Sequence, residues 1–237
     1  MLLKDKKCLI FGVANNRSIA YGIASCFKEQ GARLAFSYAG EAIHKRVEPI
    51  SEELGGEFIF PCDVTSDEDI AAAAALVKEK WGSVDVLVHS VAFANREDLT
   101  KRFIETSRDG FATALNVSAY SLTALCHAFE PMLNPGASVL TMTYYGAQKI
   151  ITNYNVMGVA KAALEASVRY LSVDLGAKDV RINAISAGPL KTLASSGISD
   201  FKQIFNHIEE HAPLRRNVTT EDVGKAASSS LPISAPP

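Results

Sequence analysis

The chain has 237 residues, of which 48% are hydrophobic and 21% are charged, and its formal net charge is −2. A chain of this length and composition, without a linker or an internal repeat, is expected to form one large domain with a sizeable core. The nearly balanced charge gives no electrostatic basis for binding nucleic acid or an anionic membrane, and no apolar run is long enough to span a bilayer.

Cysteine and histidine usage argues against an oxidising compartment and against a metal site. The four cysteines form no CxxC pair and lie in apolar stretches, which is typical of buried thiols in a reducing cytosol. The first residues are too few and too charged for a signal peptide. His207 and His211 are four residues apart in HIEEH, but this order differs from the HExxH motif of zinc proteases. We therefore expect a cytoplasmic protein that binds no metal.

Short apolar runs alternate with longer helical patterns along the chain. The runs predict six β-strands, at 7–11, 33–38, 57–61, 84–90, 137–143 and 180–186. The amphipathic patterns predict helices at 18–30, 41–54, 67–81, 107–133 and 154–175. Strands that are apolar on both sides suit a sheet covered by helices on both faces. This alternation predicts a single-domain α/β fold, with a Rossmann-like, doubly wound parallel sheet and right-handed crossovers.

The loop after the first strand is a candidate phosphate-binding turn. Gly12 allows a tight turn, and the helix that begins near Ser18 and Ile19 offers free N–H groups to a pyrophosphate. Asn16 and Ser18 stand where the usual dinucleotide fingerprint has glycines. Taken alone, the loop is equally consistent with an ordinary strand-to-helix turn.

The ends of the other strands support a dinucleotide site, because ligands of such sheets lie beyond the carboxyl ends of the strands. The Asp63 carboxylate could accept from an adenine amino group, and the Val64 side chain could pack on the ring. The small residues from Ser90 to Ala94 would let a ribose approach the backbone. At the sixth strand, Leu190 could present backbone groups to a carboxamide. The cofactor-binding positions expected after these strands are Ala39, Asp63, Val64, Val91, Leu190, Lys191, Thr192, Leu193 and Ala194.

Tyr154 and Lys161 form the candidate catalytic pair. Seven helical residues fall short of two turns by about 20°, so both side chains lie on nearly one face. A phenol that donates a proton, next to a lysine charge that favours its anionic form, can polarise a carbonyl oxygen. A pair of this kind on a helix is most often a surface accident, but the strand ends described above favour a functional interpretation.

The chain resembles the short-chain dehydrogenase/reductases and, among them, the bacterial enoyl-acyl-carrier-protein reductases. The segments that carry this resemblance are GVANNRSIAYGIA, CDVT, YNVMGVAKAALEASVRYL and RINAISAGPLKTLASSGISDF, and it extends over about residues 1–224. Ordinary members have Tyr-x3-Lys, but Met157 stands four residues before Lys161, and Tyr154 gives the Tyr-x6-Lys spacing of enoyl reductases. Tyr144 replaces the serine of ordinary members, again as in enoyl reductases.

The resemblance implies NADH-dependent reduction of trans-2-enoyl thioesters, carried by acyl carrier protein, in type II fatty acid elongation. It implies that Tyr154 hydrogen-bonds the thioester oxygen and that Lys161 binds the nicotinamide ribose. Tyr144 is implied to lie near the acyl chain, with a less certain part in a proton relay. The resemblance further implies Ala94, Tyr144 and Tyr154 as substrate-binding residues, a lid at 193–206, and a homotetramer.

The choice of cofactor depends on the residues that follow the second strand. A site for the 2′-phosphate of NADPH ordinarily has Arg or Lys directly after this strand. Here the basic residues begin only at Lys45 and Arg46. The sequence therefore favours NADH over NADPH.

The segment 225–237 departs from the family pattern. It is rich in Ser, Ala and Pro and predicts a disordered tail, whereas the family continues with another helix and a seventh strand. We therefore expect the domain at 1–224 to lack its last strand. Two other interpretations stay open: an NAD(H)-binding protein without turnover, and a 3-oxoacyl thioester reductase. Met157 disfavours the second, because that chemistry needs a tyrosine at this position.

Overall fold

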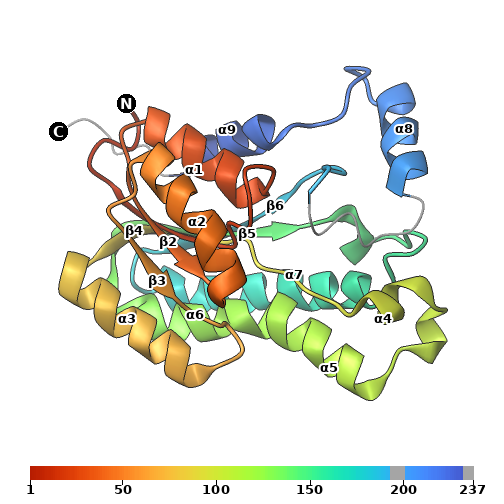
Figure 1. The fold of residues 1–237 in the computed structure, drawn as a ribbon, viewed down its shortest axis with the longest axis horizontal. Coiled ribbons are helices and arrows are strands. Elements are labelled where there is room, and N and C mark those ends of the chain that lie inside the picture. The colour runs from red at the N-terminus through yellow and green to blue at the C-terminus, as the bar shows by residue number, and fades with distance from the viewer. Residues whose placement is uncertain (193–200, 232–237) are drawn as a thin grey trace.

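The computed structural model describes residues 1–192 and 201–231 (Figure 1). Its centre is a six-stranded sheet in the order β3-β2-β1-β4-β5-β6, in which all neighbouring strands are parallel. This order is that of a doubly wound Rossmann-like sheet, so the predicted fold class is confirmed. The strands are β1 (Lys7–Phe11), β2 (Arg33–Tyr38), β3 (Phe58–Pro61), β4 (Val84–His89), β5 (Leu133–Thr143) and β6 (Arg181–Ser186).

Helices cover both faces of the sheet (Figure 1). One face carries α1 (Ile19–Glu29), α2 (Glu41–Leu54) and α9 (Thr220–Ser230). The other carries α3 (Asp67–Trp81), α5 (Arg108–Leu115), α6 (Ser121–Phe129) and α7 (Asn155–Gly176). Two further helices, α4 (Arg96–Thr100) and α8 (Phe201–His211), lie at the same end of the molecule.

The strands separate two apolar cores. In β1, Leu9 and Phe11 belong to the core that includes residues of α3, α6 and α7, whereas Cys8 and Ile10 belong to the core that includes residues of α1, α2 and α9. This alternation follows from the period of two in a strand. These four of the five β1 side chains are fully buried, so the sheet is a rigid platform for the loops at its carboxyl edge.

The predicted helix at 107–133 is interrupted. A π-helical turn at Asn116–Tyr120 separates α5 from α6, and the chain enters β5 at Leu133. Inside the turn, the buried Ser118 hydroxyl accepts a hydrogen bond from the backbone N–H of Phe93 at 3.0 Å. The interruption thus coincides with a contact between the turn and the segment after β4, which the apolar periodicity does not reveal.

The prediction of a disordered tail from residue 225 is wrong for residues 225–231. A capping box of Thr219 and Asp222 begins α9, which runs to Ser230, and Ala227 and Leu231 are buried. A Cβ on Gly224 would lie 2.5 Å from the Gly22 carbonyl oxygen of α1. The small residues that suggested disorder therefore serve close packing of α9 on α1. Residues 232–237 lie outside the described part of the chain, within which no strand follows β6.

Within the described ranges, no helix is long and apolar enough to cross a membrane. The same ranges contain no group of three or more His, Cys, Asp or Glu side chains placed to hold a metal ion. The rings of His207 and His211 stack on α8, with 4.0 Å between their centroids.

Candidate active site

The end of β1 forms a closely packed cradle. Gly12 has a φ of 102°, and a Cβ at this position would lie 2.1 Å from the Ser90 carbonyl oxygen at the end of β4. The Ser18 hydroxyl accepts from the backbone N–H groups of Ala14 and Asn15, both at 3.0 Å, and does not cap α1. The N–H groups that begin α1 therefore have no side-chain cap, which suits a pyrophosphate at the helix N-terminus.

The other expected cofactor residues lie in different environments. Val64 and Leu190 are buried in the two cores, Asp63 and Ala39 are exposed, and Ile19 and Val91 are half-buried. The Asp63 carboxylate already accepts from the backbone N–H and the hydroxyl of Thr65, at 2.9 and 2.7 Å.

The segment after β6 is described as far as Thr192, whose side chain is half-buried. The ammonium of Lys191 lies 4.2 Å from the ring centroid of Phe205 in α8, a cation–π distance that ties this segment to α8. The predicted cofactor residues Leu193 and Ala194, and the lid segment as far as residue 200, lie outside the described residues. Residues 201–206 of the predicted lid form the first part of α8.

The two tyrosines come together at the beginning of α7. Tyr144 follows the end of β5, Tyr154 directly precedes α7, and their rings meet edge to face with 5.0 Å between centroids. Tyr154 is buried, and Tyr144 and Ala94 pack against the same small apolar cluster. Burial is the main cause that raises the pKa of the Tyr154 phenol above its ordinary value, and the neighbouring Tyr144 is a second, smaller cause. The phenol is therefore a protonated hydrogen-bond donor at neutral pH.

Lys161 lies two turns further along α7, and its side chain is buried. Its ammonium donates a 2.7 Å hydrogen bond to the Met142 carbonyl oxygen near the end of β5. Burial lowers the pKa of Lys161 to about 8. The sequence predicted that the lysine charge would favour a phenolate, but in the structure burial is the largest influence on Tyr154 and keeps it protonated.

His89, the last residue of β4, is a buried polar centre that we did not single out from the sequence. Its Nδ1 lies 2.8 Å from the Thr141 hydroxyl, and its Nε2 lies 2.8 Å from the Ser121 hydroxyl. Since Ser121 donates to the Val117 carbonyl oxygen, it accepts from Nε2, and Thr141 donates to Nδ1. Burial, followed by the charge of Lys161, lowers the pKa of His89 to about 3. The ring is therefore neutral, and it joins β4, β5 and α6 beside the site.

Asn155 and Gly146 also shape the site without a sequence signal that we used. The Asn155 amide nitrogen donates to the carbonyl oxygens of Leu99 and Lys101, at 3.1 and 2.7 Å, and joins the start of α7 to the end of α4. Gly146 lies against the Tyr154 ring. A polar residue in the apolar run VDVLVHS could have identified His89, but contacts between distant segments carry no local pattern.

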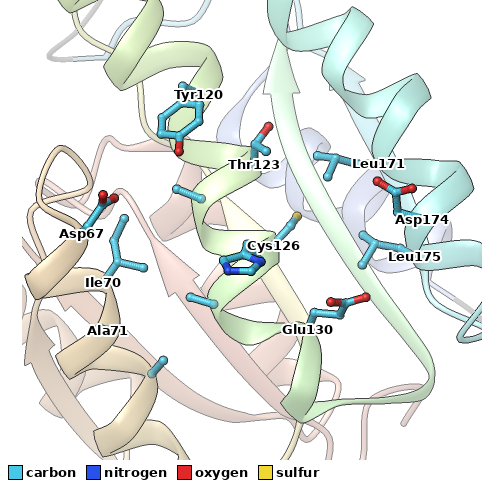
Figure 2. Close-up of a pocket in the computed structure, with 14 residues that line it drawn as sticks. Asp67, Ile70, Ala71, Tyr120, Thr123, Cys126, Glu130, Leu171, Asp174 and Leu175 are labelled. Atoms are coloured by element: carbon cyan, nitrogen blue, oxygen red, sulfur yellow. The ribbon is translucent and has the colours of Figure 1, made fainter.

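A groove in the described part of the chain lies away from this site. It has a volume of about 820 Å³ and opens among α3, α6 and α7 (Figure 2). Figure 2 shows Tyr120 and Cys126 from the α6 region facing this groove together with Leu171 and Asp174 from α7. It lies on the helices, away from the carboxyl ends of the strands, and contains none of the predicted catalytic residues.

Comparison with known proteins gives consistent matches over nearly the whole chain. A curated enoyl-[acyl-carrier-protein] reductase [NADH] of Rhizobium meliloti is 53% identical over 226 residues, which are 95% of this chain and 83% of the relative. A Bacillus cereus enoyl-acyl carrier protein reductase, solved with NADP+ and indole naphthyridinone, has a TM-score of 0.93 and 48% identity, covering 96% of this chain and 89% of that one. A reductase of the same name from Anaplasma phagocytophilum, solved with NAD, has a TM-score of 0.92 and 46% identity, covering 98% and 86%.

The family assignment rests on both the motifs and the whole chain. The family model described as enoyl-(acyl carrier protein) reductase matches residues 12–229, which include the Gly12 cradle, both tyrosines and Lys161. The match also includes most of α9, which the sequence alone had assigned in part to a tail. The chain belongs to the enoyl-acyl-carrier-protein reductase family of short-chain dehydrogenase/reductases.

Proposed function

We propose that this protein is an NADH-dependent enoyl-acyl-carrier-protein reductase, which saturates trans-2-enoyl thioesters in fatty acid elongation. One observation carries the proposal: a buried, protonated Tyr154 contacts Tyr144 edge to face at the start of the helix that also holds the buried Lys161. Relatives that are about half identical over 95% of the chain bear this activity in their names.

The proposed chemistry places a developing negative charge next to the Tyr154 phenol. When bound, NADH would supply a hydride to the β-carbon of the enoyl thioester, electron density would move to the thioester oxygen, and a proton taken up at the α-carbon would complete the saturated product. Tyr154 donates a hydrogen bond to that oxygen and stabilises the charge as it forms. Because burial keeps this phenol protonated, its proton is available when the oxygen becomes negative. Tyr144 fixes the ring of Tyr154 through the edge-to-face contact.

Lys161 has a binding role in this proposal. Its ammonium has three N–H donors, one of which is directed to the Met142 carbonyl oxygen, so the end of β5 fixes its position. We assign it to the ribose hydroxyls of the nicotinamide half. The Gly12 cradle and the start of α1 are proposed to hold the pyrophosphate, Asp63 and Val64 the adenine, and residues 190–194 the nicotinamide.

The preference for NADH follows from the end of β2. Ala39 and Gly40 are exposed there, and Lys45 pairs at 3.6 Å with Glu41 of its own helix. No Arg or Lys follows the strand directly, where a 2′-phosphate site ordinarily has one. Parallel titrations with NADH and NADPH test this preference, and tighter binding of NADPH would contradict it.

We further propose that the segment 193–206 covers the acyl chain of the substrate. We also propose that the protein is a cytoplasmic homo-oligomer, and a tetramer by resemblance to the family. Large apolar side chains are exposed in the region of the groove described above. Tyr120, which lines the groove, is 55% exposed, and on α7 the side chains of Tyr170 and Val173 are 79% and 74% exposed. Exposed apolar surface of this kind is typical of an interface between subunits. Light scattering of the purified protein tests this proposal, and a monomer at micromolar concentration would contradict it.

The activity is tested with purified protein, NADH, crotonyl thioester and acetoacetyl thioester, by following the absorbance of the reduced nicotinamide. We expect oxidation of NADH with the crotonyl thioester alone. Oxidation with acetoacetyl thioester alone, or binding of NADH without oxidation, would contradict the proposal.

A further inference from the structure

Gly146 lies in contact with the ring of Tyr154. It is the middle residue of a short 3₁₀ turn at Tyr145–Ala147, directly after Tyr144. A Cβ at Gly146 would lie 2.5 Å from Cδ1 and 2.9 Å from Cε1 of Tyr154, and 3.3 Å from Cδ1 of Tyr144. Carbon atoms pack at about 3.5–4.0 Å, so no side chain fits here unless a tyrosine ring moves.

Space, and not backbone conformation, is what requires a glycine at position 146. Gly146 is not among the described glycines with positive φ, so an alanine can adopt its backbone angles. A substitution by alanine therefore adds one methyl group against Tyr154 without adding torsional strain.

A second glycine closes the same contact from the side of α7. Gly158 lies about one turn after Tyr154, and a Cβ on it would lie 2.9 Å from the Gly146 carbonyl oxygen and 3.7 Å from Cδ1 of Tyr154. Glycine in a helix interior costs about 1 kcal/mol relative to alanine, so α7 carries this residue against its own helical preference. The two glycines let the turn after β5 rest directly on the first turn of α7.

The other neighbours of Tyr154 resist a compensating movement of the ring. Tyr154 packs in a buried cluster with Leu99, Ala114, Val156 and Met157. A methyl group on Gly146 would therefore press on the Cδ1–Cε1 edge of a ring that is already packed in this cluster. Because the hydroxyl lies at the far end of the ring, a small tilt at this edge displaces the hydrogen-bond donor.

We propose that Gly146, supported by Gly158, is a positioning residue that sets the location of the Tyr154 hydroxyl for enoyl reduction. The inference rests on the role proposed above for Tyr154. A misplacement of a catalytic group by about 1 Å can lower turnover by about a hundredfold. The proposed device therefore acts on kcat and leaves the binding of NADH nearly unchanged.

The test is a double-mutant cycle of Gly146→Ala with Tyr154→Phe. We expect Gly146→Ala alone to lower kcat with crotonyl thioester by about tenfold or more, with a change in NADH Kd below about twofold. In the Tyr154→Phe background, where the hydroxyl is already absent, the same substitution is expected to lower kcat by less than about threefold. Gly158→Ala, whose Cβ would lie 2.9 Å from the Gly146 carbonyl oxygen, is measured in the same cycle as a second variant that presses on the same contact. The matched control is Gly176→Ala on α7, whose Cβ would meet no atom within 4 Å.

The cycle separates failure of this inference from failure of the proposed function. Full activity of Tyr154→Phe by itself would refute the role of Tyr154. Reduced activity of Tyr154→Phe, together with equal losses from the glycine substitution in both backgrounds, would overturn the inference about Gly146 alone. An unchanged kcat in a folded Gly146→Ala protein would overturn it as well.

Discussion

The substitution Lys161→Met separates the binding function of this side chain from its effect on stability. Lys161 is only 6% exposed, and its pKa is lowered from an ordinary 10.5 to about 8. Such a shift corresponds to about 3 kcal/mol of destabilisation by the buried charge. Methionine has a similar length and no charge, but it leaves the Met142 carbonyl oxygen without its donor, which costs about 1–2 kcal/mol. The variant should therefore be more stable than the wild type by roughly 1–2 kcal/mol at pH 7.

The pH dependence of this difference has a definite sign. Between pH 8 and 10.5 the unfolded chain still binds the lysine proton, whereas the folded protein has released it. Raising the pH through this window therefore stabilises the wild type but not the variant. The variant's advantage in stability should be largest below pH 8, shrink as the pH rises, and reverse by pH 10.5, where the wild type has lost the charge penalty and the variant still lacks the donor to Met142.

Urea unfolding of both proteins at several pH values, with NADH titrations by fluorescence, measures both effects. We expect Lys161→Met to lower the affinity for NADH by about tenfold or more, because this is the typical contribution of a hydrogen bond to a charged group. The matched control is Lys80→Met on α3, where the exposed side chain should change stability by less than about 0.5 kcal/mol. A Lys161→Met protein that is less stable than the wild type and binds NADH equally well would refute the reasoning.

Three further substitutions test separate parts of the account. Tyr154→Phe should lower kcat by about a hundredfold and leave NADH affinity within about twofold, measured by steady-state kinetics and titration, because it removes only the donor to the oxyanion. The wild type should lose about 2 kcal/mol of stability between pH 6.5 and 4.5 from His89, whose folded pKa of about 3 lies below that of the unfolded chain. His89→Gln should lack this component in acid unfolding, and an identical pH profile would contradict it. Gly12→Ala should destabilise the fold more than Gly40→Ala in urea unfolding. Both glycines have positive φ, but only a Cβ on Gly12 meets an atom within 4 Å.

The strands and the long helices could be predicted because their signals are local. Helices α2 and α3 begin and end at the predicted residues, since turn residues and a cap mark their ends. The π-helical turn at Asn116–Tyr120 could not be predicted, because it depends on contacts with the segment after β4. The α9 helix was missed altogether, because its Ser and Ala residues resemble those of a disordered tail unless their packing on α1 is known.

The candidate site shows the same division. The spacing of Tyr144, Tyr154 and Lys161 was visible in the sequence, and the structure places both tyrosine rings in contact. The surrounding residues were not identified: Gly146 is recognised only by its distance from the tyrosine rings, and the role of His89 only by its partners on β5 and α6. Sequence motifs identify groups that meet a ligand, whereas the groups behind them are defined by the packing of distant segments.

The central claim is that this site delivers a hydride to the β-carbon of an enoyl thioester. The most direct measurement uses NADH deuterated at the transferred position of C4, crotonyl thioester and mass spectrometry of the product. The account predicts a butanoyl thioester with one deuterium at the β-carbon and, in deuterated water, a second at the α-carbon. Recovery of unchanged crotonyl thioester, or, in ordinary water, deuterium at any carbon of the product other than the β-carbon, would contradict it.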